Sequence, residues 1–220
     1  MSNQGNAPRS QPPSSPSTAP REKPDESQVV GKYLRDLVLA VERVDRESLT
    51  NVVNCIASAL VSGSRLLIAG NGGSGSSAIH MASDWTEAST GFQLSPLILA
   101  LNSNIAQVTS IANDYGYDQI FSRQLVNSGR AGDVLLLLSV SGDSANLVRA
   151  AVAAKDIKMK VVSVLGRRGE LANLSDSCAV LGENDYGLSE DLHLALAHIV
   201  VRFLNDGLPQ RFEARGGLTR

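Results

Sequence analysis

Two short segments rich in glycine and serine have residue types suited to holding a phosphate. The first Gly–Ser segment, GNGGSGSS at residues 70–77, has four glycines and three serines in eight positions and follows the apolar run LLIA. The second Gly–Ser segment, SVSGDS at residues 139–144, follows VLLLL. Glycines let the backbone approach a ligand, hydroxyls donate hydrogen bonds, and a helix that begins there adds partial positive charge. Either segment alone fits an ordinary turn, but the pair favours a phosphate site.

Four further side chains have spacings that suit a metal ion. His80 and Asp84 are four residues apart, and Glu190 and His198 are eight apart, so each pair shares one face of a predicted helix. Two imidazoles and two carboxylates form a plausible tetrahedral set for zinc. The spacing alone also fits a solvated histidine–acid pair on a helix surface. The third histidine, His193, has no evident role.

The elements that position these residues follow from alternating apolar runs and helical patterns. Apolar runs without polar alternation are typical of parallel strands covered on both faces. They predict an α/β fold, a three-layer αβα sandwich with a five-stranded parallel sheet. Ligands of such sheets bind at the carboxyl ends of the strands, where both Gly–Ser segments fall. The expected strands are 65–70, 96–101, 134–140, 160–166 and 178–182, and the expected helices are 75–88, 103–129, 144–157 and 188–205.

A long helical segment is expected before the first strand. Apolar residues recur at three- and four-residue spacing from Glu26 to about Ser62, and Gly63 then ends the pattern. The apolar stripe between Leu34 and Val44 is wide for a helix that covers only its own domain. Part of this stripe is therefore expected to contact another subunit.

Composition predicts one folded domain with a tail at each end. Residues 1–25 are dominated by Pro, Ser, Gln and Asn and are expected to be a disordered tail. We expect a single domain over 26–210 and a short tail over 211–220.

Charge and hydropathy exclude several classes of protein. The 22 acidic and 20 basic side chains nearly balance, which argues against nucleic acid as a partner. No segment resembles a secretion signal or a membrane span, so we expect a soluble, cytoplasmic protein that does not bind membranes. Cys55 and Cys178 are predicted to be buried thiols, and Trp85 a core or interface residue.

Five sequence blocks together carry a family resemblance. LLIAGNGGS, AIHMASDW, IANDYGYDQIFSRQL, LLLLSVSGDSANLVRAA and EDLHLALAHIVV occur in this order within residues 30–205. In order and spacing they resemble the phosphoheptose isomerases of the sugar isomerase (SIS) domain family. The resemblance implies conversion of sedoheptulose 7-phosphate to D-glycero-D-manno-heptose 7-phosphate, commonly with one zinc ion per site. It also implies a homotetramer whose active sites lie at subunit interfaces.

The resemblance also assigns roles to residues. The positions of His80, Asp84, Glu190 and His198 match the family's metal ligands. Asp84 and His198 match the carboxylate and the histidine that share the proton transfers through an enediol. The positions that match substrate-binding residues are Asn71, Gly72, Gly73, Ser74, Asn113, Asp114, Ser139, Val140, Ser141, Ser144 and Glu190.

Four positions depart from the family pattern. Asp84 replaces a glutamate, Glu190 a glutamine, Val140 a threonine and Asp143 an asparagine. Aspartate is one methylene shorter than glutamate, and Glu87, one turn further along the same helix face, could take over its role. A carboxylate at Asp143 is unfavourable beside a phosphate unless it points away or caps the following helix.

Three interpretations stay open at this point. The chain is an isomerase of the family's substrate, an isomerase of a related heptose phosphate, or a non-catalytic SIS protein. Some relatives of the last kind regulate the initiation of bacterial replication. The departures at Asp84, Val140 and Asp143 favour the non-catalytic interpretation. Retention of His80 and His198 favours an enzyme, because a binding module needs neither a metal nor a base.

Overall fold

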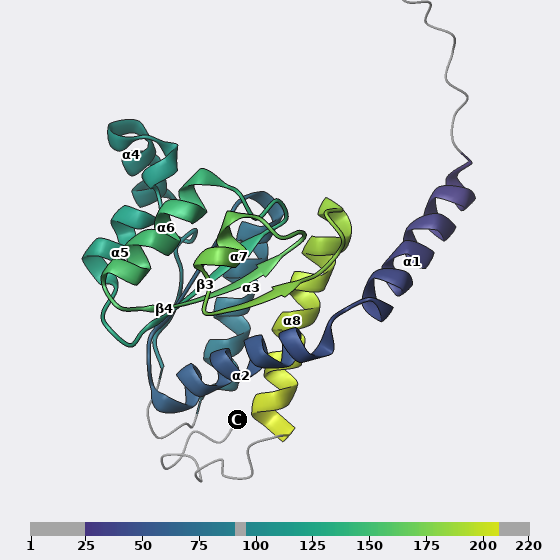
Figure 1. Ribbon diagram of the computed structural model, residues 1–220, viewed down its shortest axis with the longest axis horizontal. Coiled ribbons are helices and arrows are strands. Elements are labelled where there is room, and N and C mark those ends of the chain that lie inside the picture. Colours follow the sequence, from purple (N-terminus) through teal and green to yellow (C-terminus); the bar gives the residue numbers. More distant parts are fainter. Residues whose placement is uncertain (1–24, 91–95, 207–220) are drawn as a thin grey trace, which may run out of the picture.

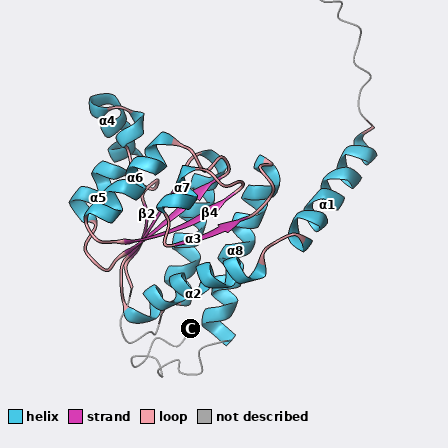
Figure 2. Cartoon of the chain, in the orientation of Figure 1, coloured by secondary structure: helices cyan, strands magenta, loops and turns pink. Residues whose placement is uncertain are grey.

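The computed structural model describes residues 25–90 and 96–206, which form three layers with a parallel sheet in the middle (Figures 1 and 2). The sheet has five strands in the order β2-β1-β3-β4-β5, and all neighbours pair in parallel. The predicted fold class is confirmed, and each expected strand is present. The strands are β1 (Leu66–Gly70), β2 (Ile98–Ala100), β3 (Val134–Ser139), β4 (Lys160–Leu165) and β5 (Ser177–Val180).

Apolar side chains of the strands pack on both faces of the sheet. Leu66 and Ile68 belong to one buried cluster, and Leu67 and Ala69 belong to another. Because successive side chains of a strand point to opposite faces, β1 contributes to both cores. The first core is covered by α2 (Arg46–Ser62), α3 (Gly72–Ala88) and α8 (Tyr186–Asp206), and the second by α4 (Ile105–Tyr115), α5 (Ser122–Ser128), α6 (Ala145–Asp156) and α7 (Glu170–Leu174).

The expected N-terminal helical segment is divided into two helices. The first, α1 (Glu26–Glu42), is separated from α2 by three residues. Asp45 is the N-cap of α2, and its side chain accepts a hydrogen bond from the Glu47 amide at 3.1 Å. Because Asp45 begins a new helix, the single helix that periodicity alone predicts is divided in two. Gly63 ends α2 as predicted, in the left-handed conformation with φ of 73°.

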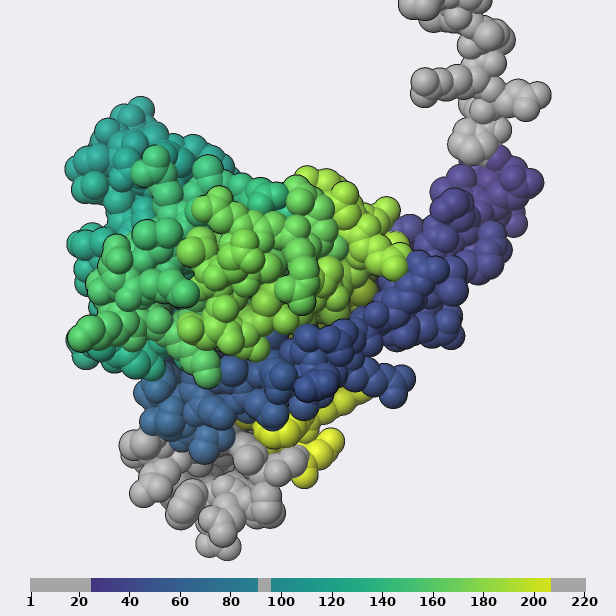
Figure 3. Space-filling view, viewed as in Figure 1, coloured from purple at the N-terminus to yellow at the C-terminus, as the bar shows by residue number. Residues whose placement is uncertain are grey.

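Helix α1 extends away from the body of the molecule (Figures 1 and 3). Its apolar side chains are largely in solvent, with Leu34 56% and Val38 57% exposed. The Tyr33 hydroxyl connects α1 to α8 by donating to the Asp191 carboxylate at 2.7 Å. This hydrogen bond, with a smaller contribution from burial, raises the pKa of Tyr33 to about 12. The structure leaves this stripe exposed, and its contact with another subunit stays a prediction.

Two further regions differ in detail from the prediction. The single helix expected over 103–129 is interrupted after Tyr115 by Gly116, whose φ is 102°, and continues as a 3-10 turn and α5. Helix α7 was not predicted, because five residues carry too little periodicity. The predicted tails at 1–25 and 211–220 lie outside the described residues, apart from Asp25. Among the described helices, none is long and apolar enough to cross a membrane.

Candidate functional site

The two Gly–Ser segments lie side by side at the carboxyl edge of the sheet. The first follows β1 and the second follows β3, and these two strands are direct neighbours. Strand β2 lies on one side of β1, and the later strands lie on the other side. The order in which strands are added to the sheet therefore reverses between β1 and β3. This switch point is where parallel α/β sheets bind their ligands.

The first Gly–Ser segment is mostly helical. Helix α3 begins at Gly72 and not near Ser76 as predicted, with Asn71 as its N-cap. The Asn71 carbonyl accepts the first helical hydrogen bond, from the Gly75 amide at 3.3 Å. The N-terminus of α3 therefore starts directly at the end of β1.

A pair of side-chain amides joins the first segment to α6, the helix that follows the second segment. Asn71 donates to the Asn146 side-chain oxygen at 2.9 Å, and Asn146 donates back to Asn71 at the same distance. Tyr117 also donates to the Asn71 oxygen at 3.0 Å. Asn146 is buried at 2% exposure. The substrate-binding role predicted for Asn71 is thus accompanied by a structural one.

The N-cap side chains of α3 and α6 accept no hydrogen bond from a backbone N–H of their helix. The caps are Asn71 and Ser144, respectively. By contrast, Asp25, Asp45 and Asn104 each accept a backbone N–H in the first turn of α1, α2 and α4. Uncapped N–H groups and the positive end of a helix dipole favour an anion. The structure thus supplies the uncapped helix starts that a phosphate site needs at both segments.

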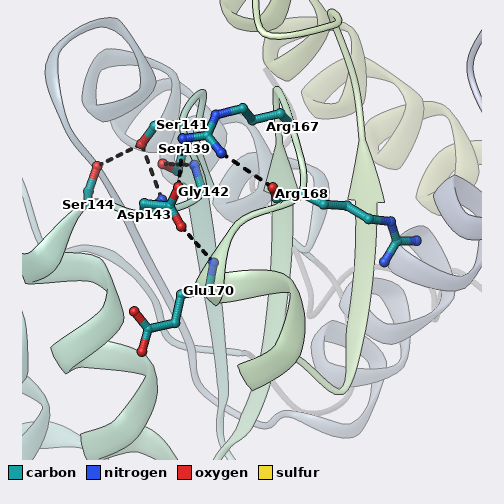
Figure 4. A network of polar contacts seen from close by, with 8 residues as sticks. All are labelled: Ser139, Ser141, Gly142, Asp143, Ser144, Arg167, Arg168 and Glu170. Carbon is teal, nitrogen blue, oxygen red and sulfur yellow. Dashed lines mark hydrogen bonds and ion pairs between the residues drawn. The ribbon is translucent and has the colours of Figure 1, made fainter.

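The second Gly–Ser segment combines a rigid backbone with two partly exposed hydroxyls (Figure 4). Ser139 is buried, and its hydroxyl accepts the Gly142 amide at 3.1 Å. The Ser141 hydroxyl accepts the Asp143 amide at 3.2 Å and lies 3.5 Å from that of Ser144. Ser139 therefore shapes the segment, while Ser141 and Ser144 can turn their hydrogens toward a ligand.

Asp143 points away from these hydroxyls, which resolves the concern raised by its charge. Its carboxylate accepts the Glu170 amide at 2.7 Å and pairs with the Arg167 guanidinium at 2.6 Å (Figure 4). The Glu170 hydrogen bond, followed by the hydrogen bond and charge of Arg167, lowers the pKa of Asp143. Asp143 thus points away from the segment, one of the two expected arrangements; its carboxylate binds the first amide of α7 and does not cap the following helix, α6.

Three of the four predicted metal ligands converge between α3 and α8. His80 Nε2 lies 3.0 Å from Asp84 Oδ2, and His198 Nε2 lies 4.0 Å from the same oxygen. One ligand atom from each residue lies within 4.8 Å of the others. Glu87 is exposed and does not belong to this group, so the structure gives no support to its taking over from Asp84.

Trp85 fixes the two helices beside this group. It is fully buried, as predicted for a core residue, and its indole N–H donates to the Ala197 carbonyl at 2.9 Å. Trp85 follows Asp84 in the chain, and Ala197 precedes His198. This hydrogen bond therefore sets the relative position of the two helices at the point where they carry the metal-ligand candidates.

Glu190 lies at the first Gly–Ser segment and not in the group of three. A Cβ on Gly73 would come within 2.1 to 2.4 Å of the Glu190 carboxylate atoms. Residue 73 must therefore be glycine for the carboxylate to occupy the N-terminus of α3, where the helix dipole favours it. Spacing placed Glu190 and His198 on one helix face, but they are more than two turns apart along it.

The remaining predicted residues occupy different surroundings. Gly72 is exposed and Ser74 is buried within the first segment, and Val140 is buried in the second. Asn113 and Asp114 lie exposed at the end of α4, where the Asn113 amide donates to the Asp114 carboxylate at 2.8 Å. In the described part of the chain, no hydrogen bond or ion pair joins Asn113 or Asp114 to the other candidate residues.

His193 is fully buried on the side of α8 that faces the sheet. Neither ring nitrogen has a hydrogen-bond partner. Burial lowers the pKa of His193 to about 4, so the imidazole is neutral at physiological pH. This histidine is therefore a core residue.

Comparison with known proteins identifies the class of this fold and site. The SIS domain model matches residues 31–166. Phosphoheptose isomerases from Helicobacter pylori and Rhodospirillum rubrum are 36% and 33% identical to the chain over 156 and 163 residues. These alignments cover 70% and 73% of the chain and 81% and 86% of the relatives. The phosphoheptose isomerase structure from Neisseria gonorrhoeae superposes with a TM-score of 0.74 at 28% identity, covering 81% of this chain and 98% of that one.

The matched SIS model spans most of the chain, and the curated relatives are covered over four fifths of their length. The chain therefore belongs to the SIS domain family and, within it, to the phosphoheptose isomerases.

Proposed function

We propose that the chain is a cytoplasmic aldose–ketose isomerase that converts sedoheptulose 7-phosphate to D-glycero-D-manno-heptose 7-phosphate. The observation that carries the proposal is the convergence of His80 and Asp84, on the helix that starts at the first Gly–Ser segment, with His198 on α8. The acid–base groups are thus held between two packed helices, α3 and α8. Separate positions for the phosphate and for the reacting carbons suit a long, phosphorylated sugar.

The three residues fit a catalytic zinc site. Zinc bonds nitrogen and oxygen at about 2.0–2.2 Å, so tetrahedral ligand atoms are about 3.4 Å apart. The separations of 3.0 and 4.0 Å around Asp84 Oδ2 lie on either side of that value. Three protein ligands would leave a fourth position for substrate, as catalytic zinc sites do. A bound zinc ion would polarise the substrate oxygens and stabilise the negative charge of the enediol.

The proton transfers are assigned to Asp84 and His198. Isomerisation removes a proton from the carbon next to the carbonyl and returns one to the neighbouring carbon. Asp84 is the carboxylate nearest to both histidines among the described residues. His198 is exposed and can exchange a proton with a substrate oxygen. The His80–Asp84 contact holds the carboxylate in place for this exchange.

We assign the phosphate to the second Gly–Ser segment. Glu190 already places a carboxylate at the N-terminus of α3, which disfavours a second anion there. The N-terminus of α6 has no side-chain cap, and Ser141 and Ser144 are partly exposed beside it. Glu190 is then positioned to accept hydrogen bonds from hydroxyls of the sugar.

A homotetramer with sites at the subunit interfaces forms part of the proposal. The exposed apolar stripe of α1 supports association. Asn113 and Asp114 point into solvent from α4, where they can act as substrate ligands if they reach the site of another subunit. Light scattering should give the mass of four chains, and a monomeric, fully active protein would contradict this part.

The test follows consumption of sedoheptulose 7-phosphate by purified protein with and without a chelator. We expect turnover that falls on chelation and returns with zinc. Asp84→Ala should lower turnover by about 10²- to 10⁴-fold and reduce bound zinc, because it removes both a ligand and the base. Glu87→Ala is the matched control and should leave both unchanged. Asp84→Glu should retain activity, since it restores the reach of a longer carboxylate.

Other outcomes support the alternatives. Tight binding of the sugar phosphate without turnover, in the presence of zinc, would favour a non-catalytic SIS protein. Turnover of a related heptose phosphate in preference to sedoheptulose 7-phosphate would favour the altered substrate. The orientation of Asp143 removes one of the three departures that favoured the non-catalytic interpretation.

A further inference from the structure

Asp143 is the one acidic residue of the second Gly–Ser segment. It directly precedes Ser144, the N-cap of α6, whose side chain makes no capping bond. Aspartate is among the best N-cap residues, and a helix N-terminus attracts any free carboxylate near it. Without another partner, the Asp143 carboxylate would compete with a phosphate for the start of α6.

The structure provides that partner on the opposite side of the segment. The Arg167 guanidinium and the Glu170 amide together hold the carboxylate at α7 (Figure 4). The Arg167 backbone is itself bound to the segment, because its amide donates to the Val140 carbonyl at 3.1 Å. Gly142 has a φ of 73°, and a Cβ there would come within 2.8 Å of the Arg167 carbonyl. Arg167 is therefore fixed in place next to Asp143 by main-chain contacts.

The neighbouring arginine differs in this respect. Arg168 extends away from Asp143 (Figure 4). It lines a pocket together with Asp45 and Glu183. Both arginines are exposed and belong to the same loop, but only Arg167 contacts the Asp143 carboxylate among the described residues.

We infer that Arg167 is a positioning residue for the phosphate site: it holds the Asp143 carboxylate away from the start of α6 and compensates its charge. The inference rests on the proposed function, since it concerns the same phosphate. An ion pair this exposed contributes little to folding stability. The effect must therefore be sought in ligand binding.

The test measures binding of inorganic phosphate and of sedoheptulose 7-phosphate by calorimetry, together with KM, kcat and the unfolding midpoint. Arg167→Gln should raise both dissociation constants and KM about tenfold at low ionic strength, and less at high salt. We expect kcat and the unfolding midpoint to stay unchanged. Adding Asp143→Asn to Arg167→Gln should restore binding, because the unpaired negative charge is then gone. Arg168→Gln is the matched control and should bind as the unaltered protein does.

The double variant separates positioning from a merely structural role. If binding weakens in Arg167→Gln and is not restored by Asp143→Asn, the pair acts only on the shape of the segment and the inference is wrong. Normal phosphate binding in Arg167→Gln would also overturn it. Calorimetry with phosphate needs no turnover, so an unaltered protein that binds phosphate but does not isomerise would contradict the proposed function and leave the inference testable. An unaltered protein that does not bind phosphate would overturn the inference.

Discussion

The two Gly–Ser segments follow neighbouring strands, and each leads into a helix whose N-cap side chain makes no capping hydrogen bond. The two helix starts differ in where the nearest carboxylate lies. At the first, the Glu190 carboxylate lies against Gly73 at the start of α3. At the second, the Asp143 carboxylate is held away from the start of α6 by Arg167 and Glu170. The comparison teaches that similar composition does not imply an equivalent ligand. If the phosphate binds as we propose, the position of the nearest carboxylate decides which helix start is open to it.

The largest change in ligand affinity is expected when a serine hydroxyl is removed from the second segment, and the first segment serves as the control. Ser141→Ala should weaken binding of phosphorylated sugar by about 1.5–3 kcal/mol, because it removes a donor to a charged acceptor. Ser76→Ala, in the first segment and exposed, is the matched control and should leave affinity unchanged. Calorimetric titration checks both variants. Equal losses in the two would show that phosphate bridges the segments.

The next prediction concerns the contact between Gly73 and Glu190. Gly73→Ala should destabilise the fold by about 1–3 kcal/mol, since the added methyl overlaps the carboxylate. Combining it with Glu190→Ala should recover most of that loss in urea unfolding. Gly31→Ala on α1 is the control, because its Cβ would meet only the flexible end of Arg35, at 3.3 Å. An unaffected Gly73→Ala protein would mean that Glu190 does not occupy the start of α3.

The next prediction removes one side chain of the amide pair that joins the first segment to α6. Asn146→Ala should cost about 1–3 kcal/mol of unfolding free energy, because it leaves the Asn71 amide nitrogen without its partner. Removing both side chains should cost less than the sum of the single changes. Asn51→Ala, exposed on α2, should stay within about 0.5 kcal/mol. Additive single and double changes would argue against a coupled pair.

The smallest effect is expected from Trp85→Phe. It removes the hydrogen bond to Ala197, worth about 0.5–1.5 kcal/mol, and leaves most of the ring in the core. Because this bond aligns α3 with α8, zinc affinity should fall as well, while phosphate binding at the second segment should not change. Zinc titration with a competing chelator measures the first quantity. A loss of phosphate affinity without a loss of zinc affinity would contradict this assignment.

Local patterns in the sequence predicted the strands, the layers and three residues of the metal group. His80 and Asp84 are four residues apart on one helix, so spacing alone brings them together. The apolar runs are long enough to identify every strand of the sheet. The break between α1 and α2 also has a local signal, because Asp45 is a good N-cap residue. The continuous apolar periodicity on both sides of Asp45 nevertheless predicted a single helical segment.

The features that sequence reasoning missed depend on contacts between distant residues. Asn146 pairs with Asn71 from 75 positions away, and Arg167 reaches Asp143 from 24 positions away. Glu190 shares a helix face with His198, but only the packing of α8 on α3 shows that it meets Gly73. Spacing within one helix cannot reveal such pairings, because they depend on how separate elements meet.

The group of three draws His80 from the third helix of the described chain and His198 from the last. During synthesis, the group of three can therefore form only once α8 has been made, since domains fold as their segments emerge. Helix α8 also covers one face of the sheet with Leu192, Leu196 and Val200. Until α8 leaves the ribosome, that face is an apolar surface that a chaperone can recognise. The chain thus acquires its full core and its reactive group in the same step.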